Sequence, residues 1–349
     1  MTINDLEFYL VEIGRTQSDQ PVRSLMARLA TDSGLEGWGE SWTNWRAAEL
    51  PARREALFPT LAGRSIFDIE ELVGLQVLSD APLRCAVEMA FWDLVGRSVG
   101  QPLCNLFGGE YRRQIPLAVR LAGDDTDRLA QLAREMAEQG FHCQIVNSSG
   151  QIQRDLEAIR TVRQSVGDRA ELRLDGAAQY DLEAAREFCA ELEDHDLQFF
   201  LDPLDTSELP PVASLARQTS VPLAVWRAIH GPADMLVLAR SGAAPLMVVD
   251  PGQVGGMTAA RNCAAVAKAA GVSAVLGGQP ALGIGTAAML QVAAATPTFA
   301  SGNESAYHQL RDDVLAEPLE IVDGMIAVPQ GSGLGVEVDR AKVERYQVV

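Results

Sequence analysis

Short β-branched or apolar runs alternate with amphipathic stretches of helical period from about residue 115 to residue 297. A short apolar run followed by a stretch of helical period is typical of a βα unit. Seven such units follow one another, which predicts parallel strands covered by helices. The expected strands are residues 115–121, 143–146, 172–175, 198–202, 222–225, 246–250 and 273–276, and the expected helices are residues 128–138, 152–166, 182–192, 209–218, 232–239, 256–270 and 284–295.

The number of units favours a barrel. A closed parallel barrel requires about eight strands, so we expect an eighth strand near residues 298–301, with its helix missing or replaced. The predicted fold class is therefore α/β, a modified (β/α)8 TIM-like barrel of the (β/α)7β type. An open doubly wound sheet is the alternative. No predicted strand leads into a G-x-G-x-x-G turn, which weakens the dinucleotide-binding form of that alternative.

The two ends of the chain have a different pattern. Residues 6–13 and 24–31 read as a strand pair, and apolar residues repeat at three-to-four spacing over residues 82–100, which predicts a helix. The C-terminal segment EIVDGMIAVP alternates like a hairpin around Asp323 and Gly324. We infer an α+β capping domain formed by the N-terminal part and the C-terminal tail. The predicted division is the cap over residues 1–114, the barrel over residues 115–315, and the returning tail over residues 316–349.

Composition and charge narrow the partners. Hydrophobic residues make up 47% of the 349 residues, enough for a full core, and the formal net charge of -18 opposes binding to nucleic acid or anionic lipid. No apolar run approaches the roughly 18 residues that span a bilayer, and the N-terminus lacks the pattern of a signal peptide. The five cysteines are scattered and contain no C-x-x-C pair, so we expect reduced, mostly buried thiols. We expect a cytoplasmic protein that binds neither nucleic acid nor membrane.

Several sequence motifs are similar to those of a known family. Through these motifs the chain resembles, over nearly its whole length, the mandelate racemase and muconate lactonizing enzyme branch of the enolase superfamily. The motifs are E-x-A-x-W-D-L at 88–94, G-x-P-L at 100–103, L-x-G-G at 106–109, VDPGQVGGMTAA at 249–260, GIGTAAMLQVAAATP at 283–297 and GSGLGVEVD at 331–339. These motifs belong to the scaffold, and a scaffold does not determine the chemistry.

The resemblance implies a definite reaction class. Such enzymes remove the proton next to a carboxylate while magnesium stabilises the enolate, as racemases, cycloisomerases or dehydratases. An active chain would therefore be an isomerase or a lyase with a carboxylate ligand, and we expect a homo-oligomer, as in many relatives. The family holds magnesium with three acidic side chains from successive strand ends, and its base is a lysine or a histidine paired with aspartate.

The residues at the implied metal positions depart from the family pattern. Asp175 and Asp202 occupy the first two, although the family usually has a glutamate at the second. The third position aligns with Trp226, followed by Arg227. An indole cannot ligate magnesium, and a guanidinium group repels it. We therefore expect magnesium to be weakly bound or absent.

Three interpretations of these acids remain open. Two carboxylates that lie close together without a cation repel each other. In the first, Arg173 or Arg227 supplies the positive charge in an arginine–carboxylate cluster. In the second, the two acids bind a metal ion weakly. In the third, they form neither a cluster nor a metal site. Strand alternation complicates the first interpretation, because if Trp226 points into the barrel then Arg227 initially points away.

The implied catalytic positions also differ from the family. Ile145 and Asn147 replace two lysines on the second strand, and neither side chain can abstract a proton. Asp250 occupies the position of an aspartate that orients a histidine, but Gln279 stands where that histidine is expected. Residues 102–267 contain no lysine, so a shift of the alignment does not restore a base. Asp250 alone would need strong desolvation to act on a carbon acid.

Aromatic and basic residues near the barrel mouth are candidates for ligand binding. Trp42 and Trp45 follow GWGES, and Arg15 begins a second loop of the expected cap. Contact between cap and barrel is the alternative role of the two tryptophans. His230, in the loop after the fifth strand, could reach the mouth or be a solvated loop residue.

Two functions follow from these residues. The first is a divergent homologue in which the metal-assisted chemistry is lost or altered, leaving a pocket that binds a small molecule. The second is an active isomerase or lyase that uses Asp250, another acid or His230 on a carboxylate or amino-acid-like substrate.

Overall fold

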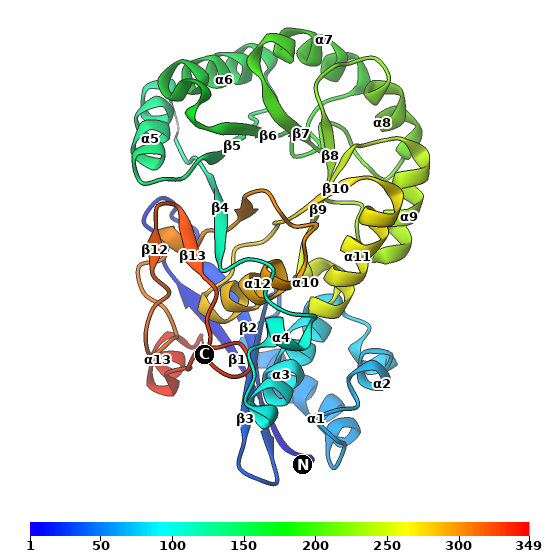
Figure 1. Ribbon diagram of the computed structural model, residues 1–349, viewed down its shortest axis with the longest axis vertical. Helices are drawn as coiled ribbons and strands as arrows, with labels where there is room; N and C mark the ends of the chain where they lie inside the picture. The colour runs from blue at the N-terminus through cyan, green and yellow to red at the C-terminus, as the bar shows by residue number, and fades with distance from the viewer. Residues whose placement is uncertain (124, 349) are drawn as a thin grey trace.

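The computed structural model describes residues 1–123 and 125–348. The N-terminal part of the chain forms an antiparallel three-stranded sheet that packs against helices (Figure 1). The longest of these helices starts where Asp80 Oδ1 accepts a hydrogen bond from Leu83 N at 2.9 Å, and it ends at Gly100 in the left-handed region. The elements are β1 (Ile3–Ile13), β2 (Val22–Thr31), β3 (Glu36–Trp42), α1 (Leu50–Leu61), α2 (Ile69–Val73), α3 (Ala81–Val99) and α4 (Leu103–Leu106).

The seven predicted βα units are present in their predicted order. Their strands are neighbours in one parallel sheet, with helices outside it (Figure 1). The fold class is therefore confirmed as the α/β type. The strands are β4 (Gln114–Arg120), β5 (Cys143–Asn147), β6 (Glu171–Asp175), β7 (Leu197–Leu201), β8 (Leu223–Val225), β9 (Leu246–Val249) and β10 (Ser273–Leu276), and the helices are α5 (Thr126–Glu138), α6 (Ile152–Val166), α7 (Leu182–Leu192), α8 (Leu209–Ala216), α9 (Pro232–Ser241), α10 (Pro251–Val254), α11 (Met257–Ala270) and α12 (Gly283–Ala295).

The eighth strand lies later in the chain than expected. It is β11 (Asn303–Glu304), which pairs in parallel with β4, whereas the sequence placed it near residues 298–301. Two residues carry no periodic pattern, so the position could not be predicted. Within the described residues β10 and β11 share no backbone ladder, and Asn303 Oδ1 instead accepts from Leu276 N at 2.9 Å. The ring of parallel strands is therefore closed between β10 and β11 by a side-chain hydrogen bond and not by backbone pairing; we call this junction the seam.

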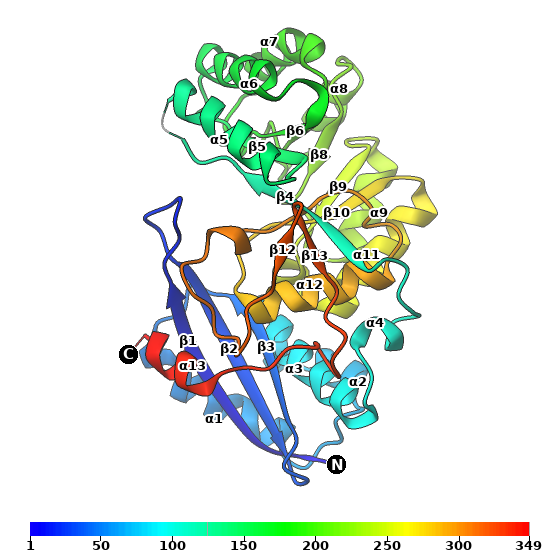
Figure 2. The same cartoon turned by 60° about the vertical axis from the view of Figure 1, so that its left-hand side comes forward.

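The C-terminal tail contacts both parts of the molecule. A hairpin joins β12 (Ile321–Val322) to β13 (Met325–Ala327), and β13 pairs antiparallel with β4. Its turn residues Asp323 and Gly324 both have positive φ, as the alternating pattern predicts for a tight hairpin. Beyond the hairpin, α13 (Arg340–Tyr346) lies against β1 (Figure 2). The domain boundaries at residues 114 and 315 stay a prediction.

Two buried carboxylates of the cap hold the ends of barrel helices. Glu88 of α3 accepts from Met257 N at 2.8 Å and from Thr258 N at 2.9 Å, at the start of α11. Glu40 of β3 accepts from Leu282 N and Gly285 N, at the start of α12. A carboxylate at a helix N-terminus satisfies free N–H groups and the helix dipole. These contacts hold the cap against the barrel, and α12 is the barrel helix that lies at the side facing the cap (Figure 2).

Neither a disulfide nor a membrane helix occurs in the described chain. All five cysteines are free and buried, as expected. No helix over residues 1–123 and 125–348 is long and apolar enough to cross a bilayer.

Candidate functional site

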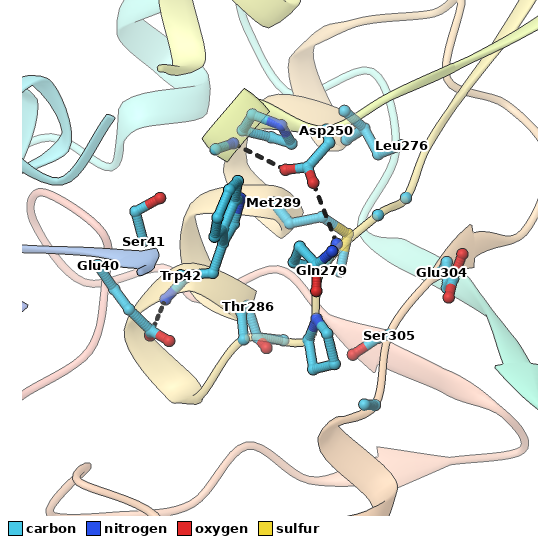
Figure 3. A pocket seen from close by; sticks show the side chains of 18 of the residues that line it. Glu40, Ser41, Trp42, Asp250, Leu276, Gln279, Thr286, Met289, Glu304 and Ser305 are labelled. Carbon is cyan, nitrogen blue, oxygen red and sulfur yellow. Dashed lines mark hydrogen bonds between the residues drawn. The ribbon is translucent and has the colours of Figure 1, made fainter. Parts of the chain in front are cut away.

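A cavity of about 350 Å³ lies at the carboxyl ends of the barrel strands, where the cap meets the barrel. Ser41 and Trp42, at the end of β3, line it from the cap. Asp250 and Gln279 line it from the loops after β9 and β10, and Glu304 faces it from β11 (Figure 3). Barrel proteins bind their ligands at this end. We therefore take this cavity as the candidate functional site.

Polar side chains stand at successive strand ends around the cavity. Arg120 ends β4, Asn147 ends β5 and Asp175 ends β6. Asp202 is the first residue after β7, and Glu304 ends β11. Because the strands are parallel, their ends meet at one edge and bring these residues together.

Arg227 bridges two of these carboxylates. Its Nη1 lies 2.8 Å from Asp202 Oδ2 and 3.5 Å from Asp175 Oδ1. Its guanidinium carbon also lies 4.9 Å from the centroid of the Trp226 ring. Arg227 points toward the acids, although strand alternation predicted that it points away when Trp226 points inward, because β8 ends at Val225 and both residues lie in the following turn. The arginine–carboxylate cluster, one of the three interpretations, is present.

Arg120 adds a second guanidinium group that the sequence argument missed. Its Nη1 donates to Asp175 Oδ2 at 2.8 Å and to Asn147 Oδ1 at 2.6 Å, and its Nη2 donates to Glu304 Oε2 at 3.2 Å. Burial by itself lowers the pKa of Arg120, but the charges of Glu304 and Asp175 outweigh this effect and raise it. Arg120 is therefore a permanent cation.

Asp202 is buried completely, and its carboxylate is fully bonded. Its oxygens accept from Trp226 N at 3.1 Å and from Arg227 N at 3.0 Å, besides the Arg227 guanidinium. Burial raises the pKa of Asp202, whereas these N–H groups and the arginine act in the opposite direction. The side chain is thus committed to the protein itself.

The cluster leaves no set of ligands for magnesium. Magnesium prefers oxygen ligands in near-octahedral geometry at about 2.0–2.1 Å. Both oxygens of Asp175 and one of Asp202 face guanidinium nitrogen, and Trp226 offers no oxygen. Among the described residues no group of three or more acidic, histidine or cysteine side chains is arranged to hold a metal ion. The residues present do not fit a magnesium ion.

Asp250 lies in the cavity wall next to Gln279. Its Oδ1 accepts from Gly252 N at 2.8 Å and its Oδ2 from Gln279 N at 3.0 Å (Figure 3). A Cβ at residue 278 would lie 2.2 Å from Asp250 Oδ2, so glycine is required there. Burial raises the pKa of Asp250 to about 6, although the backbone N–H groups oppose the rise. Gln279 meets Asp250 through its backbone.

The two residues of β5 that replace the family's lysines lie in different surroundings. Ile145 is buried in the barrel interior with Ala118 and Cys143, while Asn147 reaches the cluster at the strand end. Arg173, the other arginine of the cluster hypothesis, does not join it. Its Nε donates to Gln198 Oε1 at 2.6 Å, deeper in the barrel. Arg227 is the one of the two proposed arginines that meets the acids.

The candidate ligand-binding residues divide between the cavity and other places. Trp42 and Arg15 line the cavity. Trp45 instead packs in the cap core, with the Arg53 guanidinium 4.2 Å from its ring centroid, because the chain leaves the cavity after Trp42. His230 lines a separate hollow of about 410 Å³, and its side chain is exposed.

Two residues of the site were not found from the sequence. Arg120 closes the clear apolar run IPLAVRL, so its strand-end position was a usable signal. Glu304 sits in SGNES, where no apolar run marks a strand. It becomes recognisable once β11 is seen beside β4.

Comparisons with known proteins agree with this architecture. Residues 13–108 match the mandelate racemase / muconate lactonizing enzyme N-terminal domain, and residues 128–342 match the enolase C-terminal domain-like family. The chain is 30% identical over 330 residues to a chloromuconate cycloisomerase of Delftia acidovorans, covering 90% of this chain and 89% of that protein. It is 28% identical over 340 residues to muconate cycloisomerase 1 of Rhodococcus opacus, covering 92% and 90%.

The similarity extends to solved structures. The muconate lactonizing enzyme of Pseudomonas putida superposes with a TM-score of 0.91, covers the whole of both chains and is 23% identical. At this identity the likeness concerns the fold.

Proposed function

The chain belongs to the mandelate racemase/muconate lactonizing enzyme branch of the enolase superfamily, and we propose that it is a metal-independent member whose barrel cavity binds a small organic molecule. In this proposal the family's magnesium-assisted proton abstraction is lost or altered. The observation that carries it is the position of Arg227, whose Nη1 contacts both Asp175 and Asp202. A guanidinium group there neutralises the two acids and repels a divalent cation.

The absence of lysine at the family's two catalytic positions on the second strand supports the same proposal. Ile145 is buried and apolar, and Asn147 is held by Arg120. Neither of the chain's two lysines can act as the base, since Lys268 lies in the last turn of α11 and Lys342 Nζ donates to Leu315 O, and neither lines the cavity. The side chains that remain can bind and orient a ligand, but they lack the lysine that removes a weakly acidic proton.

Calorimetric titration with magnesium tests the metal part. We expect no sub-millimolar binding by the wild type and no change of Tm on adding a chelator. Arg227→Ala should lose about 1–3 kcal/mol of stability, because it leaves the buried Asp202 without its arginine and Asp175 with Arg120 alone, while the lost guanidinium was partly exposed. The same variant should gain magnesium affinity. Arg217→Ala, an exposed arginine at the end of α8, is the control. Sub-millimolar wild-type binding that Asp175→Asn removes would refute the proposal.

Proton exchange in heavy water tests the chemical part. Incubation with a set of carboxylic acids should leave the α-position unlabelled if the family's chemistry is lost. As a gain-of-function arm, Ile145→Lys, Asn147→Lys and Trp226→Asp combined with Arg227→Ala, which frees both acids, should restore metal binding before activity, because catalysis depends on placement at the sub-ångström level.

Asp250 favours a second candidate function. Its carboxyl group is buried in the cavity wall, and a pKa of about 6 makes it a stronger base than an ordinary aspartate. An isomerase or lyase acting on a carboxylate or amino-acid-like substrate could use it as the base. Deuterium incorporation by the wild type that disappears in Asp250→Asn would favour this candidate, and uniform absence of exchange would reject it.

A further inference from the structure

The charged groups around the cavity indicate which kind of ligand it binds. We infer that the cavity binds a small organic molecule with a protonated amine, and that this ammonium group forms an ion pair with Asp250. This inference rests on the proposed function, since it names the ligand class of the same cavity.

Negative charge exceeds positive charge around the cavity when all groups are ionised. Three guanidinium groups line it, against four carboxylates, and Asp202 adds a fifth directly behind Arg227. Arg227 is committed to Asp202 and Asp175, and Arg120 to Asp175 and Glu304. Committed arginines attract a further anion weakly. The balance therefore disfavours a carboxylate ligand and favours a cation.

Asp250 is the carboxylate left for that cation. It is buried in the cavity wall, and among the described residues its hydrogen-bond donors are the backbone N–H groups of residues 252, 253 and 279 (Figure 3). Within residues 1–123 and 125–348 no arginine, lysine or histidine forms an ion pair with it. A buried carboxylate is stabilised best when a cation also contacts it.

Glu40 also forms no ion pair within the part of the chain that the structure describes, but its surroundings differ. It accepts from Ser24 Oγ, Leu282 N and Gly285 N at the start of α12, a helix of 13 residues. The dipole of such a helix supplies positive potential. Asp250 instead precedes α10, which has four residues and a correspondingly small dipole. Asp250 is thus the less compensated acid.

An apolar wall adjoins Asp250. A Cβ at residue 252 would lie 2.7 Å from Trp42 Cδ1, so the indole packs directly on the residue whose N–H binds Asp250. Met89 and Met289 line the same cavity. An aromatic ring beside a carboxylate suits an ammonium group, and the thioethers suit its hydrocarbon body.

Arg15 is the feature that could reverse this preference. Of the three lining arginines, it is the one whose hydrogen-bond partners among the described residues are uncharged, namely Gln20 O at 2.9 Å and Ser18 Oγ at 2.8 Å. If Arg15 governed binding, a carboxylate would bind better than an amine. The experiment therefore needs ligands that share one body and differ in charge.

Three probes with a four-carbon chain make this comparison: n-butylammonium, 1-butanol and butyrate, titrated by calorimetry into the full-length protein. We expect n-butylammonium to bind at least tenfold more tightly than 1-butanol and butyrate to bind most weakly. Asp250→Asn should lower the n-butylammonium affinity at least tenfold, to the level of 1-butanol. Asp181→Asn, which alters another helix-capping aspartate outside the cavity, should leave all three affinities unchanged.

Equal affinity for n-butylammonium and 1-butanol, tighter binding of butyrate, or an unchanged affinity in Asp250→Asn would overturn the inference. Circular dichroism checks that the variant is folded, and Asp250→Ser replaces it if it is not. The order of the three probes on the wild type decides the question even without a variant. Magnesium binding and proton exchange are measured separately, so failure of the proposed function is distinguishable from failure of this inference.

Discussion

Single side chains at strand ends determine the electrostatics of the barrel mouth. Arg227 and Arg120 neutralise Asp175 from two sides, at 3.5 and 2.8 Å. Asp250 has no such partner among the described residues, and Gly278 leaves room for its carboxylate. Each acid at the mouth therefore has its own environment.

The pH dependence of stability should identify Asp250. Its folded pKa of about 6 lies above the ordinary aspartate pKa of 3.8, so between these values the folded state binds more protons than the unfolded state. Stability must then fall as pH rises through that window, by up to about 3 kcal/mol for this group. Urea unfolding at pH 4 to 7 should show the wild type losing about 1–3 kcal/mol more than Asp250→Asn. Parallel curves for the two proteins would contradict this, and Asp181→Asn should follow the wild type.

At the scale of elements, the molecule depends on a few joints between regular segments. Seven strands pair through backbone ladders, but β11 meets β10 through Asn303. The cap is joined to the barrel through acids placed at helix starts, such as Glu88 at α11. These joints should be the sensitive points of the fold, because a buried donor left without its acceptor is costly.

Asn303→Ala should open the seam between β10 and β11. The change leaves Leu276 N without its acceptor at a buried position, so we expect a loss of about 1–2 kcal/mol. Hydrogen exchange should show faster exchange of the Leu276 amide. Asn105→Ala removes an exposed asparagine bond and serves as the control. Unchanged protection of Leu276 would mean that the seam is held by other contacts.

Glu88→Ala should loosen the start of α11. The carboxylate accepts from Met257 N, from Thr258 N and Oγ1, and from Trp92 Nε1, so its removal leaves several buried donors unpaired. We expect a loss of about 2–4 kcal/mol in chemical denaturation. Glu88→Gln keeps one acceptor and should lose less. Glu183→Ala, exposed in the first turn of α7, should have little effect; a similar loss there would argue against a specific joint.

At the scale of the whole molecule, cap and barrel together form the site. The cavity is lined from β3 and from the barrel loops, so neither part has it alone. The chain carries a formal net charge of -18, which surrounds the site with negative potential. This field favours the approach of a cationic ligand and repels an anionic one.

The net charge also predicts a salt response. Raising sodium chloride from about 20 mM to about 300 mM shortens the Debye length and screens the self-repulsion of the folded state. We expect Tm to rise by a few degrees in differential scanning calorimetry. The same molar concentration of a neutral osmolyte controls for effects other than screening. A lower Tm in salt would show that attractive surface ion pairs outweigh the repulsion.

The sequence by itself determined the features that depend on local periodicity and residue type. Seven strand–helix units, the hairpin at Asp323 and Gly324, and the lack of lysine over residues 102–267 could all be read from the chain. The side-chain direction within a strand or helix follows from its repeat, so these elements need no knowledge of distant contacts.

The tertiary structure decided which of these residues meet. Arg120 contacts Asp175 and Glu304, which are 55 and 184 residues away along the chain. Arg227 turns toward the acids because β8 has ended, and no repeat governs a side chain beyond the end of its strand. The two-residue strand β11 forms because β4 offers it a partner. Local pattern thus defined the barrel, while ring geometry and turns after the strands determined the site, because contacts between distant residues exist only once the strands have assembled.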